Sequence, residues 1–215
     1  MLRNLFSEVI HEKDIKVTPT FFEVLDIIEE NLIKEQDSKL ILLNLPTGYG
    51  KTRISIILGK ACDEGLIDSF LRVVHIIPTR SLAEDIIRHA MLLNARVAAQ
   101  YMHADPGLKS PYFLAPFVVT TLDSFSFNFF KLPLAERKYM LLSEGLGHSE
   151  IPRYAIYTAL NFFDEYHIFT LSEYGIEDVR QLALKATTTM LVLSLIHISE
   201  PTRPLYISYA VFCLK

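Results

Sequence analysis

Short apolar runs of strand length alternate along this chain with longer stretches whose apolar residues recur at helical spacing. Continuous apolar runs are typical of strands that are buried on both faces of a sheet. Helices between such runs favour parallel connections. The pattern therefore predicts an α/β fold, a mostly parallel sheet with helices on both faces. The expected strands are residues 39–44, 72–77, 96–102, 117–121, 161–163 and 190–192.

A helix near the N-terminus is predicted by apolar residues at helical spacing and by a capping-box pair three residues apart. The apolar face comprises Phe21, Phe22, Leu25, Ile28 and Leu32, and the capping pair is Thr20 and Glu23. Further helices are expected at residues 51–61, 81–93 and 177–185, and Ser81 would cap the second of these. The stretch 131–153 contains glycines and prolines and is the best candidate for a loop-rich insertion.

A glycine-rich turn lies between the strand at 39–44 and the helix at 51–61. Gly48 and Gly50 permit positive φ, so that backbone amides can point at an anion beside the helix N-terminus. Lys51 would place its charge on the β- and γ-phosphates, and Thr52 would offer a hydroxyl to magnesium. The predicted nucleotide-binding residues are Thr47, Gly48, Tyr49, Gly50, Lys51 and Thr52. The plainer alternative is an ordinary glycine turn with an exposed lysine.

An acidic pair, Asp164 and Glu165, ends the apolar run at 161–163 and so falls at the carboxyl edge of the expected sheet. Ligands of open α/β sheets bind along that edge. Asp164 would hold magnesium, and Glu165 would orient or deprotonate the attacking water. The plainer alternative is a solvated turn. With Lys51, the pair predicts a site that binds and hydrolyses a nucleoside triphosphate.

Composition narrows the ways in which this chain can contact a partner. The formal net charge is −4, so nucleic acid would have to be held by local groups rather than by net charge. No apolar run reaches the length of a membrane span. The chain has two cysteines, of which Cys213 lies in the tail described next. We expect a cytoplasmic protein that does not contact a membrane.

The tail, residues 193–215, resembles the translation of a transposon-based sequencing adapter followed by a flow-cell primer in the same frame. The agreement covers 193–203 and 207–215, which is 20 of the last 23 residues. We therefore interpret the tail as a read-through artefact and expect the natural sequence to be cut near Val192. The alternative is a genuine amphipathic terminal strand.

The motifs together resemble those of the superfamily-two helicases with a DExH box, whose motor domains have a RecA-like P-loop NTPase fold. Residues 46–52 and 164–167 resemble motifs I and II, and residues 78–82 resemble motif Ia. Residues 118–124 resemble the next DNA-contact segment. The combination is most similar to the CRISPR-associated helicase of type I systems. The resemblance implies a helical segment at 1–38 and the first RecA-like domain at 39–192, truncated at motif III.

This resemblance also implies partners and further site residues. The cofactors would be ATP and Mg²⁺, and the polymer would be single-stranded DNA, with RNA possible. A CRISPR effector complex and a separate nuclease would be the protein partners. The implied nucleic-acid contacts are Pro78, Thr79, Arg80, Thr120 and Thr121, and His167 would couple the nucleotide site to them. Such contacts would position a strand without reading its sequence.

Several differences from the helicase pattern affect the activity that we expect. No adenine-reading glutamine fits upstream of the phosphate turn, and Leu195 replaces the alanine expected in motif III. No second RecA-like domain with an arginine finger follows, and such a finger contributes on the order of 10³ to 10⁵ in rate. We therefore expect the full-length parent to be an ATP-hydrolysing helicase and this fragment to be inactive. The alternatives are another superfamily-two translocase, of repair, restriction or RNA remodelling, and a P-loop module that uses nucleotide as a switch.

Overall fold

The computed structural model describes residues 1–13, 19–34, 40–43, 45, 49–110, 112–131, 148, 150–165 and 210–213. The helices are α1 (Leu2–Lys13), α2 (Pro19–Ile28), α3 (Lys51–Asp63), α4 (Arg80–Leu92), α5 (Leu122–Phe129) and α7 (Glu150–Tyr157), with a π-helical segment η1 (Glu29–Lys34) and a short 3₁₀ turn η2 (Pro106–Leu108). The strands are β1 (Leu40–Leu43), β2 (Arg72–Ile77), β3 (Val97–Gln100), β4 (Phe117–Thr121), β5 (Ala159–Phe163) and β6 (Ala210–Cys213).

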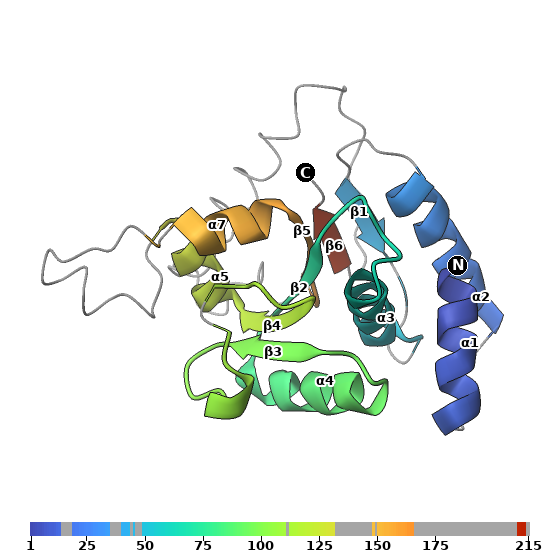
Figure 1. Cartoon of the computed structure of the whole chain (residues 1–215), viewed down its shortest axis with the longest axis horizontal. Coiled ribbons are helices and arrows are strands. Elements are labelled where there is room, and N and C mark those ends of the chain that lie inside the picture. The colour runs from blue at the N-terminus through green and yellow to red at the C-terminus, as the bar shows by residue number, and fades with distance from the viewer. Residues whose placement is uncertain are drawn as a thin grey trace, which may run out of the picture.

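These strands form one sheet in the order β1-β6-β5-β2-β4-β3, with helices on both sides (Figure 1). Strands β5, β2, β4 and β3 are mutually parallel. Strand β6 is antiparallel to both of its neighbours, so β1 and β5 run in the same direction on either side of it. The predicted α/β fold, a mostly parallel sheet covered on both faces, is confirmed.

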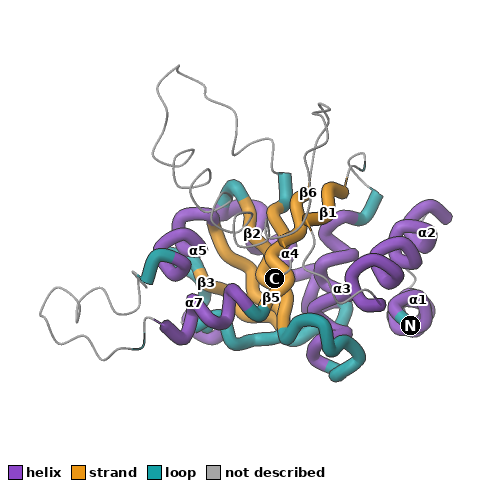
Figure 2. Tube along the Cα trace, turned by 90° about the horizontal axis from the view of Figure 1, so that it is seen from above, coloured by secondary structure: helices purple, strands orange, loops and turns teal. Residues whose placement is uncertain are grey.

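Successive residues of β2 face opposite sides of the sheet, as the period of a strand requires. Val73 and Ile77 join a core beneath α1, α2, α3 and α4, whereas Val74 and Ile76 join a second core beneath α5 and α7. Figure 2 shows these two helical layers on either side of the strands, seen from above. Because both faces are buried, the apolar run of β2 has no polar alternation.

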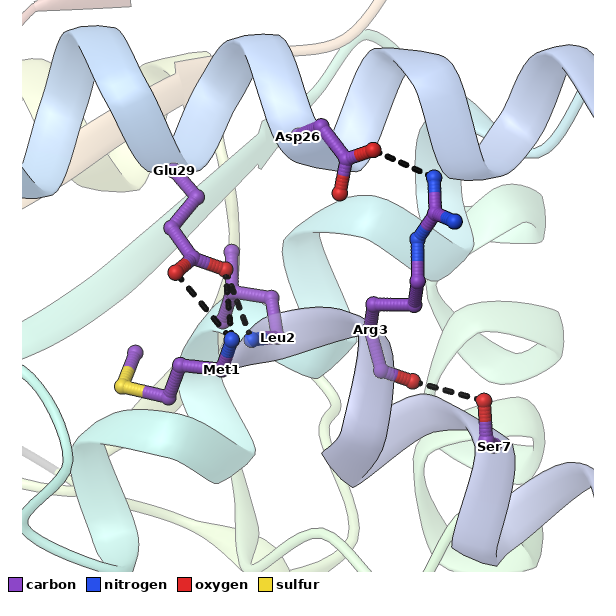
Figure 3. Close-up of polar contacts among 6 residues, drawn as sticks. All are labelled: Met1, Leu2, Arg3, Ser7, Asp26 and Glu29. Carbon is purple, nitrogen blue, oxygen red and sulfur yellow. Dashed lines mark hydrogen bonds and ion pairs between the residues drawn. The ribbon is translucent and has the colours of Figure 1, made fainter.

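The N-terminal helices α1 and α2 extend the first layer by packing beside α3. Polar contacts hold this part of the chain together (Figure 3): Arg3 of α1 pairs with Asp26 of α2, and both oxygens of Glu29 in η1 accept from the N-terminal amine at 3.0 and 3.1 Å. Helix α2 begins at Pro19, so Thr20 lies inside the helix and is not its cap. The predicted apolar face is present, since Phe21, Leu25 and Ile28 are buried.

The predicted bounds of the other strands and helices agree with the structure at some elements and differ at others. The strands at 72–77 and 117–121 have the predicted bounds. Helix α4 begins at Arg80 with Thr79 as its N-cap, two residues before the predicted cap at Ser81. The predicted elements at 177–185 and 190–192, and most of 131–153, lie outside the described residues. None of the described helices combines the length and apolar character needed to cross a bilayer.

Strand β6 comes from the tail that we interpret as read-through. It lies between β1 and β5, in register with Leu40 to Leu43 on one side and with Asn161 to Phe163 on the other. Every other described strand of the sheet points the opposite way. The read-through interpretation is untested by this placement and stays a prediction.

Candidate nucleotide and nucleic-acid sites

The carboxyl ends of β2, β4 and β5 meet at one edge of the sheet. Ile77 is level with Thr121 on β4, and the backbone N–H of Asp164 donates to the carbonyl of Ile76 at 2.9 Å. The residues that follow these strands are therefore neighbours, although they are far apart along the chain. This edge is where ligands bind in open α/β folds.

Lys51 is the first residue of α3, and its side chain reaches this edge from the neighbouring element. Its Nζ lies 3.5 Å from Oε1 of Glu165, although 113 positions separate Lys51 from Asp164 in sequence. The side chain of Lys51 is buried, and that of Glu165 is 23% exposed. The expected convergence of the lysine with the acidic pair is therefore present in the structure.

Gly50 starts α3 in a conformation that other residues rarely adopt. Its φ is 91°, and it has no side chain to obstruct the ring of Phe21 from α2. A Cβ at this position would lie 2.7 Å from two ring carbons of Phe21. Helix α2 thus packs directly against Gly50, the residue that precedes Lys51.

Asp164 is almost fully buried, and each of its carboxylate oxygens has a donor. Oδ1 accepts from the backbone N–H of Glu165 at 3.0 Å, and Oδ2 lies 3.3 Å from Nε2 of His75. Burial raises the pKa of this carboxyl, but the hydrogen bond and charge of His75, the charge of Lys51 and the Glu165 amide together outweigh burial. The net effect is a pKa below the ordinary value of 3.8, so Asp164 is ionised at neutral pH.

Glu165 has a φ of 50°, in the left-handed region that an L-residue with a side chain seldom occupies. Such a conformation costs of order 1–3 kcal/mol and persists where surrounding contacts enforce it. Here the enforcing contacts are the bond from the Glu165 amide to Asp164 and the approach of its carboxylate to Lys51.

Sequence reasoning missed His75, which lies at the centre of β2 and has no exposed surface. Besides facing Asp164, it places Nδ1 at 2.7 Å from Oγ of Ser55, and that Oγ lies 2.8 Å from the carbonyl oxygen of Thr52. A buried polar path therefore joins the first turn of α3 to the acidic pair. The available signal was a single imidazole within an otherwise apolar strand.

The predicted nucleic-acid residues divide into two groups. Thr79 and Arg80 are exposed at the start of α4, and Pro78 is half-buried just before them. Thr121 is 9% exposed, but Thr120 has no exposed surface, and its hydroxyl donates to the carbonyl of Gln100 at 2.7 Å. In this arrangement Thr120 is a core residue with its hydroxyl already engaged.

Several predicted residues lie outside the part of the chain that the structure describes. These are Pro46, Thr47 and Gly48 in the phosphate turn and His167 after the acidic pair. Tyr49 is described and is 38% exposed beside Gly50. The roles predicted for the undescribed residues of the phosphate turn and for His167 therefore stay predictions.

The residues present fit magnesium held together with a nucleotide. Mg²⁺ prefers oxygen ligands and is usually bound by one or two carboxylates together with substrate phosphates. An ionised Asp164 meets the first requirement, and Thr52, in the first turn of α3, carries a hydroxyl that could supply a second oxygen ligand. Among the described residues, no group of three or more His, Cys, Asp or Glu forms an all-protein metal cage.

A scan against protein-family models finds no match to this chain, and a search of curated proteins finds none either. The fold itself identifies the chain as an α/β domain with a mostly parallel sheet.

Proposed function

We propose that this chain is a motor domain of an ATP-dependent nucleic-acid helicase or translocase. The observation that carries the proposal is the approach of Lys51 Nζ to Glu165 Oε1 at 3.5 Å, beside a buried and ionised Asp164. A lysine at a helix N-terminus and a carboxylate pair at a strand end are the two halves of a site for phosphoryl transfer to water. The contact brings these halves together across the sheet edge.

Each residue has a distinct role in this proposal. Lys51 and the amides at the start of α3 bind the β- and γ-phosphates, since both present positive charge at one point. Glu165 orients a water or takes its proton, which requires a carboxylate that faces the phosphates rather than the core. Asp164 and Thr52 are the residues that would hold magnesium, which would neutralise charge on the phosphates.

Glu165 forms an ion pair with Lys51. Binding of a triphosphate would replace this ion pair with contacts from Lys51 to phosphate oxygens, which carry more negative charge than one carboxylate. Glu165 would then be released to face the attacking water. The ion pair therefore holds both groups close to their proposed working positions.

The nucleic-acid part of the proposal rests on Thr79, Arg80 and Thr121. They lie at the same sheet edge as Asp164, and the first two are exposed. Single-stranded DNA is the favoured polymer and RNA the alternative. The narrower proposal, a helicase of type I CRISPR defence with an effector complex and a nuclease as partners, is supported by the sequence at 120–124 and 45–49.

One observation favours the alternative of a nucleotide-dependent switch module. Thr120 was expected to contact phosphates, yet its hydroxyl is buried on Gln100. A module of this kind would keep the nucleotide site and lack the nucleic-acid surface.

The test measures two equilibria on one preparation of the chain: a fluorescent ATP analogue with and without Mg²⁺, and labelled single-stranded DNA or RNA. We expect Mg²⁺-dependent binding of the analogue and stronger binding of DNA than of RNA. Nucleotide binding without either polymer would favour the switch module. Failure to bind the analogue at any Mg²⁺ concentration would overturn the proposal.

A further inference from the structure

His75 is placed where a core residue would be expected, yet it carries two ring nitrogens that need partners. Its ring stacks on Phe162 with centroids 4.7 Å apart and meets Phe117 edge-on at 6.0 Å. A buried imidazole without hydrogen bonds costs several kcal/mol. Here both nitrogens have partners, and those partners belong to the two halves of the candidate nucleotide site.

The direction of these hydrogen bonds follows from the groups themselves. An ionised carboxylate can only accept, so Nε2 of His75 carries a proton and donates to Oδ2 of Asp164. The Ser55 hydroxyl has one proton. It donates either to the Thr52 carbonyl, in which case Nδ1 donates to Ser55, or to Nδ1. In both arrangements the donor to Asp164 is the same.

We propose that His75 is a positioning residue, which fixes the carboxylate of Asp164 and ties its orientation to the first turn of α3. The inference rests on the proposed function, because it assigns a role within that same nucleotide site. The rigid ends of the path support it: His75 is clamped between Phe117 and Phe162 in a central strand, and Ser55 lies on the helix that begins with Lys51.

A histidine that orients a metal-binding carboxylate affects metal affinity more than overall binding. Removal of such outer partners typically costs about 10- to 100-fold in metal affinity. A purely structural histidine would lower stability and leave the metal dependence unchanged. A titration with metal therefore distinguishes a positioning role of His75 from a purely structural one.

The experiment compares three variants with the wild-type chain. His75→Phe keeps a ring in the aromatic stack and removes both hydrogen bonds, whereas His75→Gln keeps an amide that can donate to Asp164. Thr120→Val is the matched control, since it deletes a different buried hydrogen bond on the neighbouring strand β4. Each is titrated with Mn²⁺ in the presence of ADP, followed by electron paramagnetic resonance, and with ADP alone, followed by fluorescence.

We expect His75→Phe to raise the Mn²⁺ concentration for half-saturation by about tenfold while metal-free ADP binds as in wild type. We expect His75→Gln to recover most of that loss and Thr120→Val to match wild type. A folded His75→Phe chain with wild-type Mn²⁺ dependence would overturn the positioning role alone. If the wild-type chain binds no nucleotide, the proposed function fails and this role fails with it.

A ligand-free readout checks the contact itself. The imidazole N–H of Nε2 should give a proton resonance protected from solvent exchange, and it should shift in Asp164→Asn and be unchanged in Thr120→Val. A freely exchanging Nε2 proton would contradict the geometry on which the inference depends.

Discussion

The two candidate surfaces at the carboxyl edge of the sheet are built differently. At the nucleotide site, Lys51, Asp164 and Glu165 are buried or half-buried and contact one another, and His75 joins them from beneath. At the nucleic-acid surface, Thr79 and Arg80 are exposed, and Thr120 is in the core. A site for one small charged ligand needs fixed, partly desolvated groups, whereas a track for a moving polymer needs accessible ones. Contacts within the structure therefore support the predicted nucleotide site more than the predicted nucleic-acid surface.

The largest expected effect is a loss of stability on substitution of Gly50, the residue that precedes Lys51. Gly50→Ala should lower the free energy of unfolding by about 2–4 kcal/mol, because a Cβ would both strain a φ of 91° and overlap Phe21. Gly65→Ala is the control: its φ is 67° but nothing lies within 4 Å of the added Cβ. It should cost about 1 kcal/mol. Urea unfolding measures both, and equal losses would show that contact with Phe21 is unimportant.

A second prediction separates the two threonines at the end of β4. Thr120→Val should cost about 1 kcal/mol of stability by removing the bond to the Gln100 carbonyl, with no change in single-strand affinity. Thr121→Val, at a residue that is 9% exposed, should weaken single-strand binding and cost no more stability than Thr120→Val. Denaturant unfolding and fluorescence anisotropy provide the two measurements. Weaker DNA binding by Thr120→Val alone would reverse this assignment.

A third prediction tests the exposed arginine at the start of α4. Arg80→Ala should weaken single-strand binding and reduce the slope of log affinity against log salt by about 0.7, the value for one lost phosphate contact. Arg88→Ala, on the same helix and also exposed, should change neither quantity. Anisotropy titrations at several salt concentrations provide the test. The same slope for wild type and both variants would remove Arg80 from the surface.

The smallest effect is the acid sensitivity of Asp164. Its pKa is lowered in the folded chain, so its stabilising contribution is present above the ordinary value of 3.8 and is lost as pH falls through the lower folded value. The stability advantage of wild type over Asp164→Asn should therefore shrink as pH falls below about 4. Urea unfolding from pH 7 downward measures it. A constant advantage would show that the carboxylate is not stabilised by His75 and Lys51.

The sheet was readable from the sequence where burial is complete. The runs at 72–77 and 117–121 are mostly apolar because both faces of β2 and β4 are covered, and their predicted bounds are confirmed. Helix starts were less accurate, because Pro19 and Arg80 are acceptable first residues and a capping pattern fits several neighbouring positions.

The candidate site was only partly readable. Local motifs identified Lys51, Asp164 and Glu165, because their chemistry depends on short segments of fixed spacing. They could not identify His75, since its partners Ser55 and Asp164 are 20 and 89 positions away. Nor could they reveal that Thr120 faces inward, which depends on the register between β3 and β4.

The central claim is that Lys51 and the acidic pair bind the terminal phosphates of one nucleotide. Its most direct test is isothermal titration of Lys51→Ala with ATP and with AMP, both in Mg²⁺. Lys60→Ala is the control, a lysine on the same helix that pairs with Glu64 instead. We predict that Lys51→Ala binds ATP about 10- to 100-fold more weakly, as loss of a charged hydrogen bond implies, and AMP as wild type does. Unchanged ATP affinity in Lys51→Ala would contradict the account.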